Sequence, residues 1–551
     1  PDDFASDLVA MFYQGDTPTN VCPSIHCLNS IGVHLAVRES PALRDRKILR
    51  FLFSRMVIVG MLIFLQLAFL VALLVTLEGH LVYAYPVLLV LSVGVSVWVV
   101  TGEANPAYKL SWVLLISAVP VFGGLFYLMF GNQRTPDDLK ARIQQFYDAT
   151  IQRVHPNFRC WEDLSKVGRD LATEAAYIEN VSGFPVWDGT QGEYFPIGEA
   201  FFESLKEELQ KAQKFIFMEY FIIREGQMWD PILEILKKKA ASGVEVRLLY
   251  DDVGTLQTLP SNYRSTLEKA GIRTAIFNPF RPHLNMAMNY RDHRKITVID
   301  GNIGYCGGLN LADEYINAYE KHGHWKDTAV MLRGQAVWNL TLMFLMMWQF
   351  TTTVEADFDR YRPTMNLPSD GFVQPFGDSP LDNLNVSETA YMQIINRAHD
   401  YVYITTPYLI LDNEMVTSLI NAAQSGIDVR IITPHVADKW YVHMVTRSYY
   451  AQLIRGGVKI YEYTPGFIHS KMFVSDDQVA IVGTANMDYR SFYLHFECGV
   501  SFYQSTMAAK VRDDILRTLK VCQPVELDEL NRAPLYHRAF TKLLRLMAPL
   551  M

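Results

Sequence analysis

The chain of 551 residues repeats one order of secondary-structure elements, once in each half. Residue patterns predict a buried strand, an amphipathic helix and a second strand in the first half, at 215–221, 229–242 and 244–250. The second half repeats this order with a strand at 401–408, a helix that ends at Ser425 and a strand at 427–433. The recurrence predicts an α/β fold of two duplicated domains, with mixed β-sheets flanked by helices.

A longer motif extends the repeat. Each half continues with H-x-K-x4-D and then, after a short apolar stretch, with Gly, two residues and Asn. The first copy runs from His293 to Asn310 and the second from His469 to Asn486. Between the halves, 351–383 is rich in Pro, Asp and Gly, which predicts a long connection.

Three apolar runs lie ahead of the repeats, at 56–77, 81–101 and 110–130. Each is roughly 20 residues long, the length that an α-helix needs to cross about 30 Å of hydrocarbon. Since the runs carry almost no charge, we expect transmembrane helices rather than buried core helices. Basic residues flank the region on both sides, so the charge pattern leaves its orientation in the membrane open. They are Arg44, Arg46, Lys47, Arg50 and Arg55 before the first run, and Arg134, Lys140 and Arg142 after the third.

The predicted organisation has four parts: an N-terminal segment 1–50, a membrane region 51–131, and α/β domains at 132–365 and 366–551. The apolar segment 338–350 is too short to span a bilayer, so it is either a core helix or a surface where lipid enters. The last segment, 535–551, mixes apolar and basic residues. It predicts an amphipathic helix that either lies on an anionic membrane surface or packs on the second domain.

Charge and cysteine content exclude some classes of protein. The formal net charge of −8 argues against a nucleic-acid partner, because nucleic acids favour a basic surface. The six cysteines include no C-x-x-C pair, so neither a zinc site nor a disulfide framework is expected. Cys306 and Cys498 lie in apolar stretches, and we expect them to be buried thiols.

The two motifs combine the residue types that phosphate chemistry needs. Residues i and i+2 of a strand face the same side, so His293 and Lys295 should project together, as should His469 and Lys471. The lysine neutralises phosphate oxygens, while the imidazole attacks phosphorus or transfers a proton. Two half-sites that face each other would place one imidazole on each side of a phosphodiester, as an in-line displacement requires. No metal and no cofactor are expected, because lysines rather than carboxylates supply the phosphate site.

These paired motifs resemble the phospholipase D superfamily, and further stretches are similar to the bacterial cardiolipin synthases. The stretches are Met218–Phe221, Asn289–Lys295, His324–Thr328 and Asn486–Phe492. The segment Asn105–Lys109, which precedes an apolar run containing Phe122-Gly123-Gly124, resembles the membrane anchor of that family. A third apolar run is a departure, since two N-terminal helices are the commoner pattern.

The resemblance implies a metal-independent, two-step phosphatidyl transfer in the bacterial cytoplasmic membrane, with phosphatidylglycerol as substrate and cardiolipin as product. It implies His293 as the nucleophile and His469 as the general acid and base, although the near-symmetry of the motifs leaves the reverse assignment open. The other candidates are Lys295, Lys471, Asn310 and Asn486 for the phosphate oxygens, Asp300 and Asp476 for a structural or histidine-orienting role, and Glu314 and Glu497 for orienting a histidine across the interface.

Several alternatives stay open at this point. A nuclease with the same catalytic pair is disfavoured by the acidic chain and the membrane runs. A hydrolytic phospholipase D, or a transferase that uses another phospholipid donor such as phosphatidylethanolamine, would carry the same motifs. A membrane scaffold with an inactive site would have lost a histidine or lysine, and all four are present. The sequence does not decide whether the chain forms a homo-oligomer.

Overall fold

The computed structural model describes residues 81–118, 123–131, 137–154, 158–280, 289–355, 357–381, 384–532 and 534–550. The predicted membrane helix at 56–77 lies outside these residues. Contacts divide the chain into two compact units, and the larger one contains both predicted α/β domains except for Phe280–Asn285.

The described residues of the first half form a seven-stranded sheet with the order β1-β9-β7-β6-β2-β3-β4. Strands β2, β3 and β4 are parallel to one another, whereas the remaining pairs are antiparallel, so the sheet is mixed. Its strands are β1 Thr190–Phe195, β2 Phe215–Tyr220, β3 Glu245–Asp251, β4 Arg273–Phe277, β6 Ile296–Ile299, β7 Ile303–Gly307 and β9 Ala329–Gly334.

The second half repeats that topology strand for strand. Its path is β10-β17-β16-β15-β11-β12-β13, with β18 added beyond β13. The predicted duplication of a mixed α/β fold is therefore confirmed. The strands are β10 Phe372–Asp378, β11 Tyr401–Thr405, β12 Asp428–Pro434, β13 Lys459–Tyr463, β15 Met472–Ser475, β16 Val479–Gly483, β17 His495–Tyr503 and β18 Cys522–Pro524.

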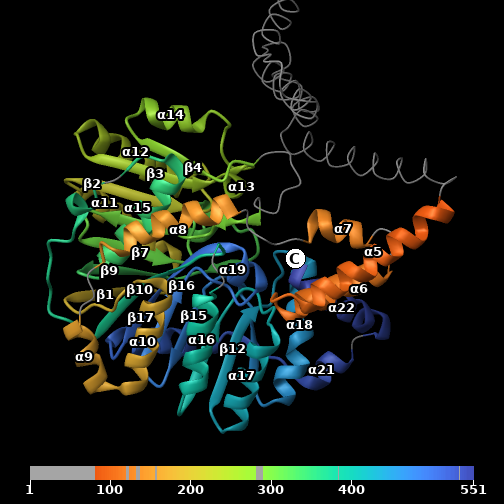
Figure 1. Cartoon of the computed structure of the whole chain (residues 1–551). Helices are drawn as coiled ribbons and strands as arrows, with labels where there is room; N and C mark the ends of the chain where they lie inside the picture. The colour runs from red at the N-terminus through yellow and green to blue at the C-terminus, as the bar shows by residue number, and fades with distance from the viewer. Residues whose placement is uncertain are drawn as a thin grey trace, which may run out of the picture. The chain divides into compact units, whose positions relative to one another are not determined.

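Helices flank both sheets (Figure 1), because each sheet has an apolar face that must be covered. In the first half they are α11 Gly198–Lys211, α12 Trp229–Ala241, α13 Asp252–Thr255, α14 Tyr263–Lys269 and α15 Val337–Thr352, with 3-10 turns η3 Asp313–Ile316 and η4 Phe358–Tyr361. In the second half they are α16 Val386–Arg397, α17 Asn413–Gln424, α18 Trp440–Arg455, α19 Tyr489–Tyr493, α20 Thr506–Leu519, α21 Leu527–Asn531 and α22 Leu535–Met547, followed by η5 Ala548–Leu550.

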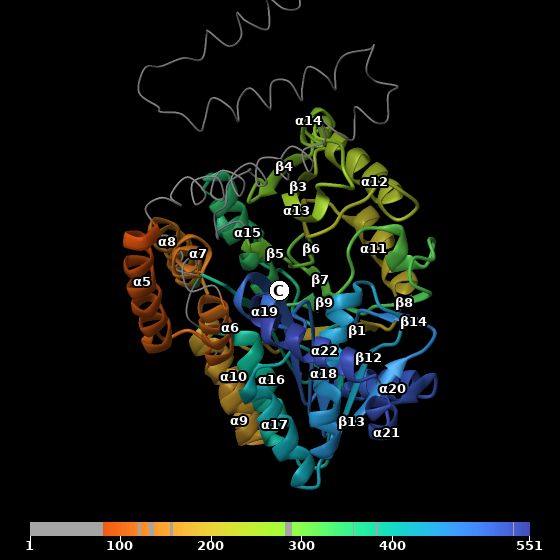
Figure 2. The ribbon, with the colours of Figure 1, turned by 90° about the vertical axis from the view of Figure 1, so that its right-hand side faces the viewer.

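Helix α15 contains the short apolar segment at 338–350. It packs against β2, β4, β6 and β7 of the first sheet and β10 of the second, and its residues from Val337 to Gln349 are buried. Figure 2 shows α15 and β4 of the first half. Of the two readings that the sequence left open, the core helix is the one that the structure shows.

Two expectations about the boundary between the halves need correction. The predicted connection at 351–383 contains strand β10, which pairs with β17 in the second sheet. Helices α8 Asp137–Ile151, α9 Phe158–Val167 and α10 Arg169–Ser182 fall in the predicted first domain. Nevertheless, α10 packs against α16 and β10 of the second half, because its buried apolar face joins that core.

The apolar region ahead of the repeats also differs from the prediction. Helix α5 Leu81–Thr101 coincides with the second predicted run. The described residues of the third run form α6 Pro106–Ala118 and α7 Gly123–Phe130. Within the described ranges, no helix combines the length and the hydropathy needed to cross a membrane.

Candidate active site between the two repeats

Each motif follows a short strand that pairs with a strand of the other half. Short strand β5, Arg291–Asp292, precedes His293 and pairs in parallel with β17 of the second half. Strand β14, Gly466–Ile468, precedes His469 and pairs in parallel with β8, His324–Lys326, of the first half. The strand that follows each motif, β6 or β15, then enters the sheet of its own half. The motif residues therefore sit at the junction of two short strands, and not within one strand as predicted.

The backbone of each histidine extends this pairing by one hydrogen bond. The His293 N–H donates to the Phe496 carbonyl at 3.0 Å, and the His469 N–H donates to the Lys326 carbonyl at 2.7 Å. The residue after each of these carbonyls is a carboxylate, Glu497 or Asp327. Cross-pairing between the halves thus brings one acidic side chain to each histidine.

Each histidine pairs with a carboxylate that belongs to the other half of the chain. Nδ1 of His293 lies 3.0 Å from both oxygens of Glu497, and Nδ1 of His469 lies 2.6 Å from Asp327 Oδ2. Because Nδ1 of each ring faces an acceptor, Nδ1 carries the hydrogen and Nε2 keeps a lone pair. This arrangement prepares both rings for nucleophilic or proton-transfer chemistry at Nε2.

The residue after the first glycine of each G-x-x-N stretch lies against the same carboxylates. A Cβ at Gly308 would lie 2.1 Å from Asp327 Oδ1, so a side chain at this position would collide with Asp327. In the second half the matching residue is Thr484, whose hydroxyl donates to Glu497 Oε2 at 2.5 Å. The two half-sites are thus related but not identical.

Glu314 does not have the position expected of it. Its carboxylate pairs with Arg224 at 3.3 Å and with Lys321 at 3.5 Å, and the carboxylate beside His469 is Asp327. The reason is register: Ala329 pairs with Gly307 as Gly499 pairs with Gly483, so Asp327 is the counterpart of Glu497.

The aspartates of the two motifs accept hydrogen bonds from backbone N–H groups. Asp300 accepts hydrogen bonds from the N–H groups of Gln213, Lys214 and Phe215 at 2.7–2.9 Å. Asp476 accepts from the N–H groups of His399, Asp400 and Tyr401 at 2.8–3.0 Å. Each carboxylate fixes the start of the neighbouring strand, β2 or β11, so of the two predicted roles the structural one describes their contacts.

The lysines and asparagines of the two motifs differ in how many of their hydrogen-bonding groups already have a protein partner. Lys295 Nζ donates to the His293 carbonyl, and Lys471 Nζ donates to the His469 carbonyl. An ammonium group has three hydrogens, so each lysine keeps donors for a ligand. Asn310 is committed: its Oδ1 accepts from the Ile222 N–H at 2.9 Å and its Nδ2 donates to Tyr315 at 2.7 Å.

The side chain of Asn486 has fewer hydrogen-bond partners than that of Asn310. Its side chain is 5% exposed, and its Oδ1 is a buried atom without a hydrogen-bond partner among the described residues. A buried amide oxygen without a partner is costly in a folded protein, unless a ligand satisfies it. Of the two predicted phosphate ligands, Asn486 is therefore the better placed to contact a substrate.

A third histidine belongs to the site, although the sequence did not single it out. His495 lies two residues before Glu497 on β17, and its Nδ1 is 3.5 Å from Glu497 Oε1. Its ring centroid lies 5.2 Å from that of His293. The counterpart in the first half is Trp325, whose ring centroid lies 5.3 Å from that of His469. The spacing of i and i+2 in one strand was the signal that could have identified His495.

Burial disfavours the charged forms of the imidazoles and of the lysine side chains at the site, so it lowers the pKa of all four groups. It lowers the pKa of His293 to about 3 and that of His469 to about 4, from an ordinary value of 6.5. Burial also lowers the pKa of Lys295 to about 8 and that of Lys471 to about 7. The positive charge of Lys471 also lowers the pKa of His469, and the charge of Lys295 lowers the pKa of both His469 and Lys471, so the two half-sites interact electrostatically.

The carboxylates respond in the opposite sense. Burial raises the pKa of Glu497, but His293 and His495 outweigh it and hold that pKa well below 4.5. Likewise, burial raises the pKa of Asp327, while His469 and Lys471 bring it below 3.8. Each dyad is thus a neutral imidazole that donates to an ionised carboxylate.

Residues next to the first motif make a buried network of their own. Arg294 lies between His293 and Lys295, and its guanidinium contacts Glu219 at 2.5 Å and Asp292 at 3.2 Å. The corresponding second-half contact is neutral, with Ser470 donating to Thr405 at 3.0 Å. The buried ion pair ties β2 to the first motif, which explains why a glutamate stands in an otherwise apolar strand.

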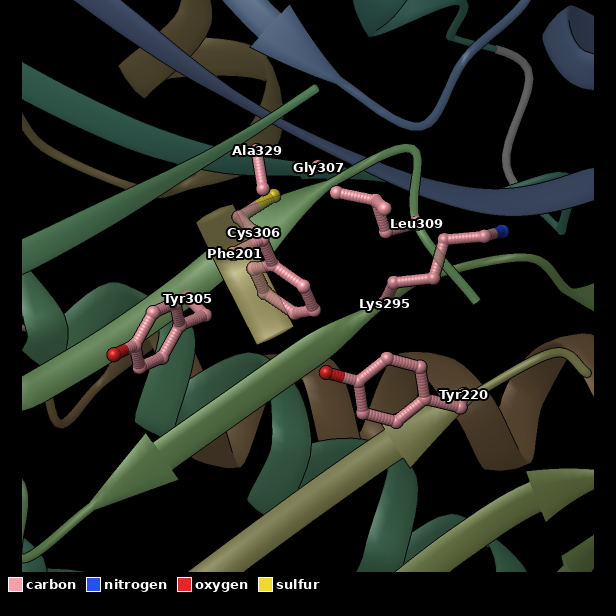
Figure 3. Close-up of a pocket in the computed structure, with 8 residues that line it drawn as sticks. All are labelled: Phe201, Tyr220, Lys295, Tyr305, Cys306, Gly307, Leu309 and Ala329. Carbon is pink, nitrogen blue, oxygen red and sulfur yellow. The ribbon is translucent and has the colours of Figure 1, made fainter. Parts of the chain in front are cut away.

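Cys306 and Cys498 are both buried, as expected. Their Sγ atoms lie 3.5 Å apart, and they come from β7 of the first sheet and β17 of the second. Cys306 also lines a small pocket with Lys295, Tyr220 and Tyr305 (Figure 3). The contact between the two thiols shows how closely the two sheets approach each other near the motifs.

Comparisons with known proteins agree with this architecture. A family model described as a cardiolipin synthase, PLD-like domain matches residues 205–330 and again 391–519, one match in each half. A second, described as phospholipase D-nuclease N-terminal, matches residues 90–132.

Individual relatives match over most of the chain. An uncharacterized protein of Streptococcus mutans is 43% identical over 83% of this chain and 100% of its own length. The cardiolipin synthases of Halalkalibacterium halodurans and Geobacillus thermodenitrificans are 33% and 35% identical, each over 86% of this chain and 95% of the relative.

Among solved structures, a phosphatidylserine synthase of Haemophilus influenzae has a similar fold. Its TM-score is 0.53 at 14% identity, and the match covers 69% of this chain and all of that one. The resemblance expected from the motifs is confirmed, and the chain belongs to the cardiolipin synthase family of phospholipase D-like proteins.

Proposed function

We propose that the chain is a phosphatidyltransferase that makes cardiolipin and glycerol from two molecules of phosphatidylglycerol. The observation that carries the proposal is the pair of histidine–carboxylate dyads exchanged between the halves, His293 with Glu497 and His469 with Asp327. The family to which the chain belongs, and the names of its relatives, support cardiolipin as the product.

In the first step, Nε2 of His293 attacks the phosphorus of phosphatidylglycerol, and the bond from phosphorus to the glycerol oxygen breaks. His469 gives its Nε2 proton to the departing oxygen. His469 must therefore be protonated at the start. Burial lowers its pKa to about 4, and a bound phosphodiester anion would raise that pKa, because a nearby negative charge favours the imidazolium form.

The phosphatidyl-imidazolium formed on His293 carries a positive charge. Ionised Glu497, 3.0 Å from Nδ1, stabilises that charge and holds the ring in place. In the second step, neutral His469 removes the proton from the terminal hydroxyl of the second phosphatidylglycerol. That oxygen attacks phosphorus, the P–N bond breaks, and both histidines return to their starting states.

Lys295 and Lys471 stabilise the charge that builds on the phosphate oxygens during both displacements. Each retains hydrogens beyond the one donated to a histidine carbonyl. Asn486, rather than Asn310, is proposed as the amide that contacts the substrate, because its Oδ1 has no other partner among the described residues.

We further propose that the catalytic unit meets the bilayer through α22 and α6. Leu535, Tyr536, Phe540 and Leu543 of α22 are all exposed, whereas Arg545 is half-buried. Arg545 lies over the ring of Tyr449 and donates to the Ser448 carbonyl. An exposed apolar helix face is suited to contact with the apolar part of a bilayer. The exposed Arg538 and Lys542 are suited to contact with anionic lipid headgroups.

Helix α6 continues this surface and leads to the active site. Ser111 of α6 donates to the Leu546 carbonyl of α22 at 2.5 Å, and Leu110 and Leu114 are exposed beside it. Asn105 donates to Tyr493 of α19, the helix that follows Asn486. Lipid at this surface would therefore lie next to the loop that carries Asn486. Multi-pass anchoring by the apolar runs at 56–77 and 81–101 is part of the same proposal.

The direct test is to incubate the purified full chain with phosphatidylglycerol and to follow products by lipid mass spectrometry. We expect cardiolipin and glycerol in equal amounts, with no product from the His293→Ala protein. Phosphatidic acid without cardiolipin would instead assign a hydrolytic phospholipase D. Cardiolipin formed only when phosphatidylethanolamine is added would assign a different donor.

A further inference from the structure

Three potential metal ligands converge at the first half-site. Nδ1 of His293 is 3.0 Å from the Glu497 carboxylate, and Nδ1 of His495 is 3.5 Å from the same group. The ligand atoms of the three side chains all lie within 4.8 Å of one another. His495 is 7% exposed, and its Nδ1 has no hydrogen-bond partner among the described residues.

The convergence follows from the strand. His495 and Glu497 are residues i and i+2 of β17, so they face the same side, and β5 pairs with β17 to deliver His293 opposite them. In the other half-site Trp325 occupies the position that corresponds to His495, and the described residues form no comparable group of three ligands there. The cluster is therefore a property of one half-site and not of the repeated motif.

We propose that His293, His495 and Glu497 form an inhibitory binding site for Zn²⁺ or a similar transition-metal ion. Two imidazoles and a carboxylate are a ligand set that proteins use for zinc, with a fourth position left for water. Zinc bonds of about 2.0–2.2 Å in a tetrahedral arrangement place ligand atoms roughly 3.3 Å apart. The two separations from Glu497, 3.0 and 3.5 Å, lie on either side of that value.

Zinc at this position would stop the proposed reaction through the tautomer of His293. A neutral imidazole carries one hydrogen. When Nδ1 binds the metal, that hydrogen must move to Nε2, which then has no lone pair with which to attack phosphorus. No proton is lost from the ring, and none of the three side chains is oxidised or reduced. The ion would also occupy the Glu497 carboxylate that stabilises the phosphatidyl-imidazolium.

This inhibition rests on the proposed function, but the binding does not, so the two are measured separately. Zinc binding to the full chain is measured without lipid, by competition with a chromogenic chelator. We expect one zinc ion per chain, lost together with inhibition when a stronger chelator is added. The His495→Asn protein should bind zinc about 100-fold or more weakly, since even changes outside the ligand shell cost 10- to 100-fold.

A matched control is His399→Asn, which removes an exposed histidine on the loop before β11 and should leave zinc affinity unchanged. If His495→Asn does not fold, His495→Gln takes its place. X-ray absorption on the wild-type protein should also count two imidazole ligands and no sulfur. Unchanged zinc affinity in the His495 variants, sulfur ligation by the nearby cysteines, or full transfer activity with zinc bound would each overturn the proposal. Absence of transfer without zinc would instead refute the proposed function.

Discussion

The imidazole of His293 lies 3.0 Å from both carboxylate oxygens of Glu497, a residue from the other half of the chain. His469 has the same relationship, at 2.6 Å, with Asp327 of the first half. Neither half contains a complete histidine–carboxylate dyad, so the site requires both copies of the repeat. This interdependence gives a physical reason why the two halves remain in one chain and in one fixed register.

Replacing either histidine should abolish transfer. We expect His293→Ala and His469→Ala each to lower the rate by about 10³-fold or more, because residues that act as one unit lose most of the rate when any one is removed. Circular dichroism and thermal unfolding check that the fold is intact. More than a few per cent of activity in either variant would rule out a mechanism with two histidines.

Removing the partner carboxylates should slow the reaction while leaving both histidines in place. Glu497→Gln and Asp327→Asn are each expected to cost about 10²-fold or more in kcat, because the amide no longer favours the Nδ1–H tautomer and stabilises the imidazolium less. Glu314→Gln is the matched control, since Glu314 pairs with Arg224 and Lys321 instead of a histidine. Near-normal activity in Glu497→Gln, or a collapse in Glu314→Gln, would contradict this assignment of carboxylates.

The depressed pKa values of the histidines predict that acid destabilises the protein. Between pH 6.5 and about 4, unfolded His293 and His469 bind protons that the native state, with pKa values of about 3 and 4, does not. The free energy of unfolding should therefore fall as the pH falls through this window, by up to about 1.4 kcal/mol per pH unit for each histidine.

Urea unfolding at pH 7 and pH 5 measures this dependence. A protein with both His293→Gln and His469→Gln should show a shallower loss of stability than the wild type, because glutamine does not titrate. His399→Gln, which replaces an exposed histidine, should keep the wild-type dependence. An equal loss in all three proteins would show that other groups cause the acid sensitivity.

Charges placed on the exposed apolar face of α22 should impair access to bilayer lipid. Leu543 is 57% exposed and Phe540 45% exposed. We expect Leu543→Glu and Phe540→Glu to lower transfer on phosphatidylglycerol vesicles about tenfold, equivalent to about 1.4 kcal/mol. Transfer on short-chain lipid dispersed in detergent should change little. Trp161→Glu, at a 42% exposed residue of α9, is the control. Equal losses with both substrates would indicate damage to the catalytic unit instead.

The sequence predicts the repeated elements closely because local patterns determine them. The strands at 215–221 and 401–408 appear as β2 and β11, and the helix at 229–242 appears as α12. The family resemblance is likewise confirmed. It could be recognised in the sequence because the His and Lys of each motif lie within a few residues of each other. Pattern and structure differ locally at the motifs, where His293 and His469 follow the short strands β5 and β14 and do not lie within one strand.

What the sequence could not supply is the pairing between the halves. The partner of His469 depends on β14 lying beside β8, a contact between segments far apart in the chain. Glu314 and Asp327 both follow Asn310, and only the register of β9 against β7 selects Asp327. The i and i+2 spacing of His495 and Glu497 could have indicated that the two share a face, but that His293 lies opposite them follows only from the pairing of β5 with β17.

The central claim is that the phosphatidyl group passes through His293. The most direct measurement is to mix the enzyme with phosphatidylglycerol carrying an isotopic label in the phosphate, to quench at short times, and to map the labelled peptide by mass spectrometry under conditions that preserve phosphohistidine. The account predicts label on the peptide that contains His293, and its release as cardiolipin when more phosphatidylglycerol is added. Label on His469 would reverse the two roles. Absence of any adduct, together with inversion of configuration at a chiral phosphorus, would contradict the two-step mechanism, since two in-line displacements must give net retention.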